Sequence, residues 1–480
     1  MYLIQPKVHS RRAFLRRSGQ LALAGSALPF ALNLAAVGEA AAFNATDYKA
    51  LVCVFLFGGN DYANTLVTYD DPSYDRYSLI RGGAGQAGGG IALAKASLTP
   101  TLLNPTVPLA GGRQYALHPS MGGLAGLFNS GKAAVQLNVG PLVVPLTKAQ
   151  YNSADRRNFP LPPRLFSHND QQSIWQSSSP EGSTVGWGGN IGDLALSSNS
   201  NSLFTCISVT GNAVFLSGDQ ALQYQVSSNG AVGINSVKNT VYGSSAVQAA
   251  MKQLIQQPRS QVLENEYNRV TVRALAAEAQ VQSALSGTPP ATVFPAANPL
   301  ADQLKMVARL IAGRNTLGAA RQVFFVSLGG FDLHDNLIAQ QPTLMARLSG
   351  GLAAFHAATV ELGVADKVTA FTASDFGRTL SSNGDGSDHG WGSHHLMVGG
   401  AVKGAAFYGT PPPVSISSTA APEDQWHVGQ GRLLPSTSVD QYAATLARWF
   451  GVADAEMAGI LPNLRNFGGA GYPVDLGFLA

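Results

Sequence analysis

Three aspartates stand where apolar segments of this chain end, a position in which carboxylates can hold a metal ion. The segments and their aspartates are 51–57 with Asp61, 323–328 with Asp332, and 368–373 with Asp375. Apolar runs without polar alternation are typical of strands buried on both faces of a parallel sheet. Because sites in such sheets form beyond the carboxyl ends of the strands, we expect the three acids to converge. Converging carboxylates repel one another unless a cation neutralises them, so the pattern predicts a metal-centred hydrolytic site.

Histidines near these aspartates narrow the choice of metal. Asp332 and His334 are two residues apart, so their side chains point the same way where the chain is extended. The polar, glycine-rich segment 384–390 adds His389 to the candidate ligands. Oxygen and imidazole ligands together suit zinc, manganese or iron better than calcium.

Each candidate also has an ordinary structural interpretation. Asp61 follows two glycines and can be a turn residue that hydrogen-bonds its own backbone. Asp375 can form an ion pair with Arg378, and Asp332 can simply hydrogen-bond the nearby histidine. His394 and His395 follow His389 closely. Loop histidines are often only solvated, but their clustering beside Asp375 favours a site.

Composition excludes several classes of protein. Of 480 residues, 45% are apolar and only 12% are charged, which is typical of a globular chain with an uncharged polar surface. The formal net charge of +3 arises in the first 42 residues, which hold five bases and one acid. The remainder has 26 bases and 27 acids. A nearly neutral chain without a basic stripe gives no support for nucleic-acid binding.

The N-terminus has the order of regions of an export signal. Residues 10–16 read Ser-Arg-Arg-Ala-Phe-Leu-Arg and resemble the twin-arginine motif, 21–37 is apolar, and Ala40–Ala42 offers a cleavage site. We therefore expect a signal peptide over 1–42 and a periplasmic or extracellular protein. The alternative is a membrane-spanning N-terminal helix, for which the apolar stretch is short. No other run approaches transmembrane length.

Residues 43–480 are expected to form one α/β domain, a three-layer, mostly parallel sheet with helices on both faces. Segments 204–210 and 213–216 read as strands, and 245–285 reads as two helices broken at Pro258. The stretch 175–300 carries no acid at a strand end and is interpreted as an insertion or cap. No heptad repeat is evident. The two cysteines, Cys53 and Cys206, lie in apolar runs and are expected to be buried thiols.

The order of several short motifs resembles a known bacterial family. The motifs are the signal, Phe-Gly-Gly-Asn-Asp ending at Asp61, Ser-His at 167–168, Gly-Gly-Phe-Asp-Leu-His at 329–334, Ser-Asp-Phe-Gly-Arg at 374–378 and Asp-His-Gly at 388–390. Together, over residues 10–451, they resemble the family called domain of unknown function 1501. That family is grouped with the alkaline phosphatase and sulfatase superfamily, which implies an alkaline phosphatase-like core with a metal site at the strand ends.

The resemblance implies a role for each candidate side chain. Ser167, at an expected helix start, would be the nucleophile, and a helix N-terminus stabilises an attacking or phosphorylated oxygen. His168 or Arg378 would bind the substrate anion. The implied metal ligands are Asp61, Asp332, His334, Asp375 and His389.

Two departures from the superfamily pattern point to a reduced site. Phe376 stands where the superfamily has the histidine of its Ser-Asp-His-Gly motif, and the spacing from Asp332 to His334 is shorter than usual. We therefore expect one or two divalent ions, zinc or manganese, in an exported hydrolase of phosphate or sulfate esters. The alternative is a non-catalytic envelope protein that binds a polysaccharide or a secreted partner. Its sugar-stacking residues would be Tyr62, Tyr69, Tyr74 and Tyr77. Substrate and oligomeric state stay open.

Overall fold

A mostly parallel sheet forms the centre of the protein, as the apolar runs predict. The computed structural model describes residues 45–83 and 90–480, so the expected signal peptide lies outside the described residues. In spatial order the strands of the sheet are β11 (Ala406–Tyr408), β4 (Ala133–Gly140), β10 (Ser393–Gly399), β9 (Val368–Ser374), β1 (Lys49–Leu56), β8 (Arg321–Leu328), β5 (Cys206–Ser208), β6 (Gln223–Ser227) and β7 (Gly230–Ala231), and β12 (Thr437–Ser438) also pairs with β4.

The three acid-bearing strands are neighbours. β1 lies between β9 and β8 and is parallel to both, with Leu56 level with Ser374 on one side and Leu328 on the other. Their carboxyl ends therefore share one edge of the sheet, which confirms the expected placement of the three segments. β10 departs from the parallel pattern, since it runs antiparallel to both β9 and β4.

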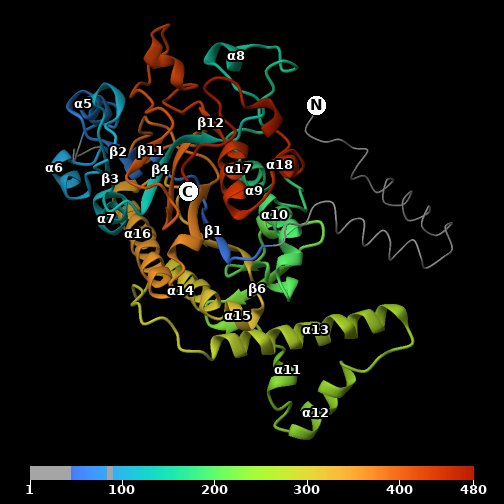
Figure 1. Ribbon diagram of the computed structural model, residues 1–480. Helices are drawn as coiled ribbons and strands as arrows, with labels where there is room; N and C mark the ends of the chain where they lie inside the picture. The colour runs from blue at the N-terminus through green and yellow to red at the C-terminus, as the bar shows by residue number, and fades with distance from the viewer. Residues whose placement is uncertain (1–44, 84–89) are drawn as a thin grey trace.

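Two helical layers cover the sheet, which confirms the three-layer expectation (Figure 1). Alternate residues of β1 serve opposite faces: Val52 and Val54 pack into one core and Cys53 and Phe55 into the other. One face packs against α7 (Gly122–Asn129), α14 (Pro299–Ala312) and α16 (Leu337–Glu361), and the other against α10 (Trp187–Ala195), α17 (Val439–Phe450) and α18 (Asp454–Ile460).

The region expected to be an insertion contains both confirmed and wrong predictions. The helices α12 (Ser245–Leu254) and α13 (Val262–Leu285) flank Pro258 as predicted. Residues 213–216 do not form a strand, because Val214–Leu216 closes into a 3₁₀ turn. Cys53 and Cys206 are free and buried as expected, and burial raises the pKa of both thiols. No helix among the described residues is long and apolar enough to cross a membrane.

A buried carboxylate joins the far end of the helix that carries Ser167 and His168 to the C-terminal region. Asp440 lies in the first turn of α17, and its Oδ1 accepts from the backbone N–H of Asn463 at 3.1 Å and from Ser178 Oγ at 3.4 Å. Ser178 is the C-cap of α9 (His168–Ser177). Burial raises the pKa of Asp440 from 3.8 to about 6.

Asp440 therefore makes stability depend on pH. An acid whose pKa rises on folding stabilises the protein fully below its unfolded pKa, and that contribution is lost as the pH rises through about 6. Asp440→Asn keeps the accepting Oδ1 but carries no charge. We expect the change that it causes in the free energy of unfolding to be more stabilising at pH 8 than at pH 4 by about 2–3 kcal/mol. Urea denaturation at both pH values measures this, with the exposed Asp366→Asn as control. An equal effect at both pH values would contradict the assignment.

Candidate functional site

Three side chains from separate parts of the chain meet beyond the carboxyl edge of the sheet. His168 is the first residue of α9, Asp332 follows β8, and His389 lies between β9 and β10. One ligand atom from each lies within 4.8 Å of the other two, and we call these residues the triad. Among the described residues, these three form a group that could hold a metal ion. They would offer it two ring nitrogens and one carboxylate oxygen.

One ring nitrogen of His168 is held by Asp375. Nδ1 of His168 lies 2.6 Å from Oδ2 of Asp375, so Nδ1 donates there and Nε2 carries the lone pair. Nε2 is buried without a hydrogen-bond partner and faces Oδ2 of Asp332 at 3.4 Å. The hydrogen bond that His168 donates to Asp375 raises the pKa of His168, against the effect of burial, because it stabilises the imidazolium.

His389 is oriented in the same way by a backbone carbonyl. Its Nδ1 donates to the carbonyl oxygen of Phe166 at 2.7 Å, so Nε2 faces Oδ1 of Asp332 at 3.2 Å with its lone pair. Burial lowers the pKa of His389, which favours the neutral ring. A ring lone pair directed at a carboxylate is repulsive unless a proton or a metal ion lies between them.

The donor set therefore fits a metal ion. Two imidazole nitrogens and one carboxylate oxygen, with room for a further ligand, are the donors of catalytic zinc sites and also suit manganese. Two ligands on one zinc ion stand at most about 4.2 Å apart, so a small movement of the side chains closes the triad. Both histidines already have the second ring nitrogen anchored, as metal-binding histidines usually do.

Arg378 holds Asp332 in place. Its Nη1 donates to Oδ1 of Asp332 at 2.6 Å and to the carbonyl oxygen of Gly58 at 3.0 Å, and its Nη2 donates to the carbonyl oxygen of Ser387. The Arg378 side chain is completely buried. Burial raises the pKa of Asp332, but the hydrogen bond and charge of Arg378 outweigh it, so the net pKa lies below its usual value. The structure thus gives Arg378 a positioning contact in place of the anion-binding role expected from the sequence.

Asp375 lies outside the triad and orients His168. Its carboxylate accepts from the backbone N–H of Gly58 at 3.2 Å and from Nε2 of Gln172 at 2.8 Å, in addition to His168. These contacts engage both carboxylate oxygens, whereas the sequence favoured a direct ligand. Gln172 was missed by sequence reasoning, although it lies four residues after His168, on the same face of α9.

We expect Asp375→Asn to weaken metal binding without abolishing it. Removal of a partner that orients a metal-binding histidine typically costs about 10- to 100-fold in affinity. Titration of metal-free protein with zinc by calorimetry measures the change. Asp332→Asn is the matched comparison, in which loss of a direct ligand reduces binding further. Equal losses in the two variants would contradict the supporting role.

Asp61 is engaged away from the triad. Its carboxylate accepts from Nη1 and Nη2 of the fully buried Arg81 at 2.9 and 2.5 Å, and from Ser387 Oγ at 2.7 Å. It also caps the short helix α4 (Tyr62–Thr65) by accepting from the backbone N–H of Asn64. The structure therefore pairs Asp61 with an arginine and does not bring it into the triad, because Arg81 already neutralises its charge.

Replacing Asp61 tests whether this residue pairs with Arg81 or binds the metal ion. We expect Asp61→Ala to lower the free energy of unfolding by about 3–5 kcal/mol, because it leaves Arg81 buried and unpaired. The zinc content of the folded variant, measured by elemental analysis, should equal that of the unaltered protein. Asp332→Ala serves as the reverse control, in which metal content falls. Loss of metal without loss of stability in Asp61→Ala would restore Asp61 as a ligand.

His334 lies on the solvent side of the triad. Its Nε2 is 3.1 Å from Oδ1 of Asp332 and 3.0 Å from Nε2 of His389, and its Nδ1 is 3.3 Å from Oδ1 of Asp388. The side chain is 44% exposed. His334 therefore reaches the cluster together with Asp332, as the two-residue spacing predicts.

Phe376 forms a wall of the site. Its ring centroid lies 4.8 Å from that of His168 and 4.7 Å from that of His389. A Cβ atom on Gly59, where φ is +81°, would lie 2.5 Å from the Phe376 ring. The three rings form a triangle, since the ring centroids of His168 and His389 are themselves 4.4 Å apart, and Phe376 packs against both imidazoles.

Ser167 is the N-cap residue of α9, at the helix start expected from the sequence. Its hydroxyl donates to Oδ2 of Asp170 at 2.8 Å and makes no hydrogen bond to the helix backbone. Asp170 is buried and lies 3.7 Å from Nη1 of Arg164. The hydroxyl of Ser167 thus has a carboxylate partner one residue away from the triad.

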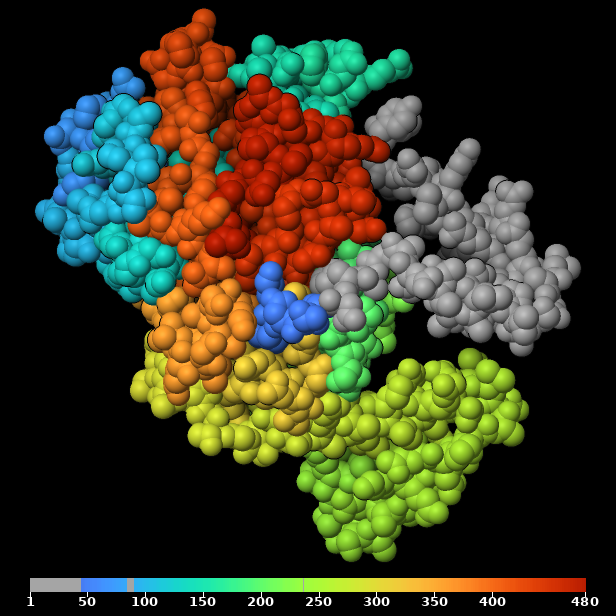
Figure 2. Space-filling model, viewed as in Figure 1, coloured from blue at the N-terminus to red at the C-terminus, as the bar shows by residue number. Residues whose placement is uncertain are grey.

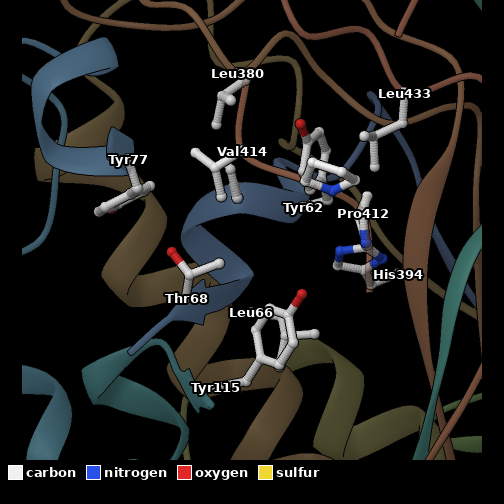
Figure 3. A pocket seen from close by; sticks show the side chains of 12 residues that line it. Tyr62, Leu66, Thr68, Tyr77, Tyr115, Leu380, His394, Pro412, Val414 and Leu433 are labelled. Carbon is white, nitrogen blue, oxygen red and sulfur yellow. The ribbon is translucent and has the colours of Figure 1, made fainter. Parts of the chain in front are cut away.

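His394 and His395, which follow His389 closely, do not join the site. His394 and His395 are buried on β10, and burial lowers the pKa of each to about 3. His394 lines a small cavity with Tyr62 and Pro412 (Figure 3), whose accessible volume of about 20 Å³ suits a single water molecule. No triad residue lines this cavity.

The fold and site define a mixed α/β protein with a candidate mononuclear metal site at the carboxyl edge of its sheet. A family described as "Protein of unknown function (DUF1501)" matches residues 48–461, and the chain belongs to that family. No curated protein matches the chain significantly. Among solved structures it is similar to the crystal structure of Ps i-CgsB in complex with k-i-k-neocarrahexaose, with 9% identity, a TM-score of 0.33, and 88% of this chain and 77% of that chain covered.

Proposed function

We propose that the protein is a metal-dependent hydrolase of phosphate or sulfate esters with one metal ion. The observation that carries the proposal is the pair of histidines, His168 and His389, whose free ring nitrogens converge on Asp332. Zinc or manganese bound there would polarise an ester oxygen and lower the pKa of a coordinated water. His168, Asp332 and His389 would hold the ion, and His334 would lie beside it at the solvent edge.

The remaining side chains would position and shield these three. Asp375 fixes the ring of His168, and Arg378 fixes the carboxylate of Asp332. Phe376 packs against the rings of His168 and His389. Catalytic groups held by packing and hydrogen bonds keep the geometry that a transition state requires.

Ser167 is the nucleophile that we propose for the reaction. Its Oγ would form a bond to phosphorus or sulfur, the bond to the leaving alkoxide would break, and the hydroxyl proton would pass to Asp170. The N-terminus of α9 at Ser167 favours the negative charge of the esterified intermediate, because its backbone N–H groups point outward. Water would then release the phosphate or sulfate.

We also propose export by the twin-arginine route, on the basis of residues 10–16. This route carries folded proteins, so metal could be bound before export and the substrate would be a periplasmic or extracellular ester. A polysaccharide bearing such esters is a substrate class that fits this location.

The alternative of a purely binding protein loses its aromatic platform. Tyr62 and Tyr77 are buried, and Tyr69 and Tyr74 pack against the same hydrophobic cluster. The rings of Tyr62 and Tyr77 are therefore not free to stack on a sugar, and those of Tyr69 and Tyr74 are only partly exposed. No described contact favours the binding role over the hydrolase.

Hydrolysis of aryl phosphates and aryl sulfates by residues 43–480, supplied with zinc or manganese, tests the proposal. We expect Asp332→Asn and Ser167→Ala each to reduce kcat/KM at least about 100-fold, because a metal ligand or the nucleophile is lost. Asp332→Asn should also lose bound metal, whereas Ser167→Ala should keep it.

Asp366 is exposed, so Asp366→Asn is the control and should retain full activity. Unchanged rates in both Asp332→Asn and Ser167→Ala would refute the hydrolase. An unchanged rate in Ser167→Ala alone would remove the serine nucleophile and leave the metal site standing.

A further inference from the structure

A helical arm projects from the body of the protein. It comprises residues 232–276, with α11 (Asn235–Lys238), α12 and the N-terminal half of α13 (Figure 1), and Figure 2 shows it as a separate lobe. More than half of the exposed large apolar side chains of the described chain lie on it. Apolar side chains gathered in this way, unlike scattered ones, mark a surface that binds another protein. They are Val232, Ile234, Tyr242, Val247, Leu254, Val262, Leu263, Tyr267, Val270 and Val272.

One apolar seam runs the length of α13 and is covered over only half of it. Its members are spaced alternately four and three residues apart, as in a coiled coil: Leu263, Tyr267, Val270, Ala274, Ala277, Val281 and Ala284. The last three are buried in the core, where α13 packs against α14 and β7. The first four are exposed, Leu263 by 86%, Tyr267 by 68% and Val270 by 49%.

The exposed half of the seam is flanked by charges of opposite sign. Glu266 and Arg273 lie one heptad apart on the same side of the seam, with Oε1 and Nη2 3.1 Å apart. Their side chains are 48% and 63% exposed. In coiled coils, charges in this flanking position choose the partner helix and its direction.

We propose that the exposed seam of α13 binds the same seam of a second copy in antiparallel orientation. A two-fold axis between residues 268 and 269 places Leu263 opposite Ala274 and Tyr267 opposite Val270 of the partner. The same axis brings Glu266 of each copy toward Arg273 of the other. A two-fold interface must be complementary to itself, and this seam has that property in both its apolar and its charged residues.

The shape of the molecule favours the antiparallel arrangement. The C-terminal half of α13 lies against the body and the N-terminal half extends away from it (Figure 1). Antiparallel pairing therefore places the two bodies at opposite ends of the paired helices. Parallel pairing would place both bodies at the same end and would turn Arg273 toward Glu278, which is buried beside Lys238.

Analytical ultracentrifugation of residues 43–480 over a range of concentrations tests the proposal. The seam spans only about three helical turns, less than a standard interface of about 800 Å² per partner, so we expect a reversible dimer at micromolar concentrations. Leu263→Asp and Tyr267→Asp should each give a monomer at every concentration. Val360→Asp, on α16 and 56% exposed in the unaltered protein, should leave the dimer intact.

Charge reversal distinguishes self-association along this seam from any other contact. Glu266→Arg alone and Arg273→Glu alone place like charges across the interface, so each should be monomeric while circular dichroism shows unchanged helix content. An equimolar mixture of the two variants restores opposite charges and should form a heterodimer. A monomeric unaltered protein at all concentrations, or a mixture that stays monomeric, would overturn the proposal.

Discussion

The parallel alignment of β9, β1 and β8 is the constraint on which the candidate site depends. Because these strands share one direction and one register, the segments that leave them start from the same edge of the sheet. Asp332 and Asp375 follow strands that are not adjacent, and Gly58, after the strand between them, is linked to both. Its backbone N–H donates to Asp375, and its carbonyl accepts from Arg378, which also donates to Asp332. A site assembled on strand ends inherits the rigidity of the sheet.

Competition for carboxylates decides which acids remain available to a metal. Buried Arg81 pairs with Asp61, and buried Arg378 pairs with one oxygen of Asp332. Asp375 is consumed by hydrogen bonds from His168, Gln172 and Gly58. A buried charge must be paired, and each pairing removes an oxygen that a second ion would need. The result is one convergent set of donors where the superfamily resemblance implied up to two.

Phe376 occupies space beside the triad where another side chain could have supplied a donor. A histidine at this position would add a donor, whereas the phenyl ring packs beside the contacting rings of His168 and His389 and is accommodated by the missing side chain of Gly59. His168 of α9, expected from the sequence to bind an anion, lies instead among the three side chains of the triad. The candidate donors are therefore two histidines and one aspartate.

The sequence by itself determined the sheet's buried strands, the closeness of Asp332 and His334, and the start of α9 at Ser167. These follow from local apolar runs and from spacings of a few residues, which act within one element. Tertiary structure alone decided that Arg81 would claim Asp61, that Phe166 would anchor His389, and that half of the α13 seam would stay uncovered. Each is a contact between segments far apart in the chain, and no pattern within either segment specifies its partner. The heptad spacing of α13 was likewise overlooked in the sequence, because its alanines and single tyrosine resemble an ordinary helix until burial separates its two halves.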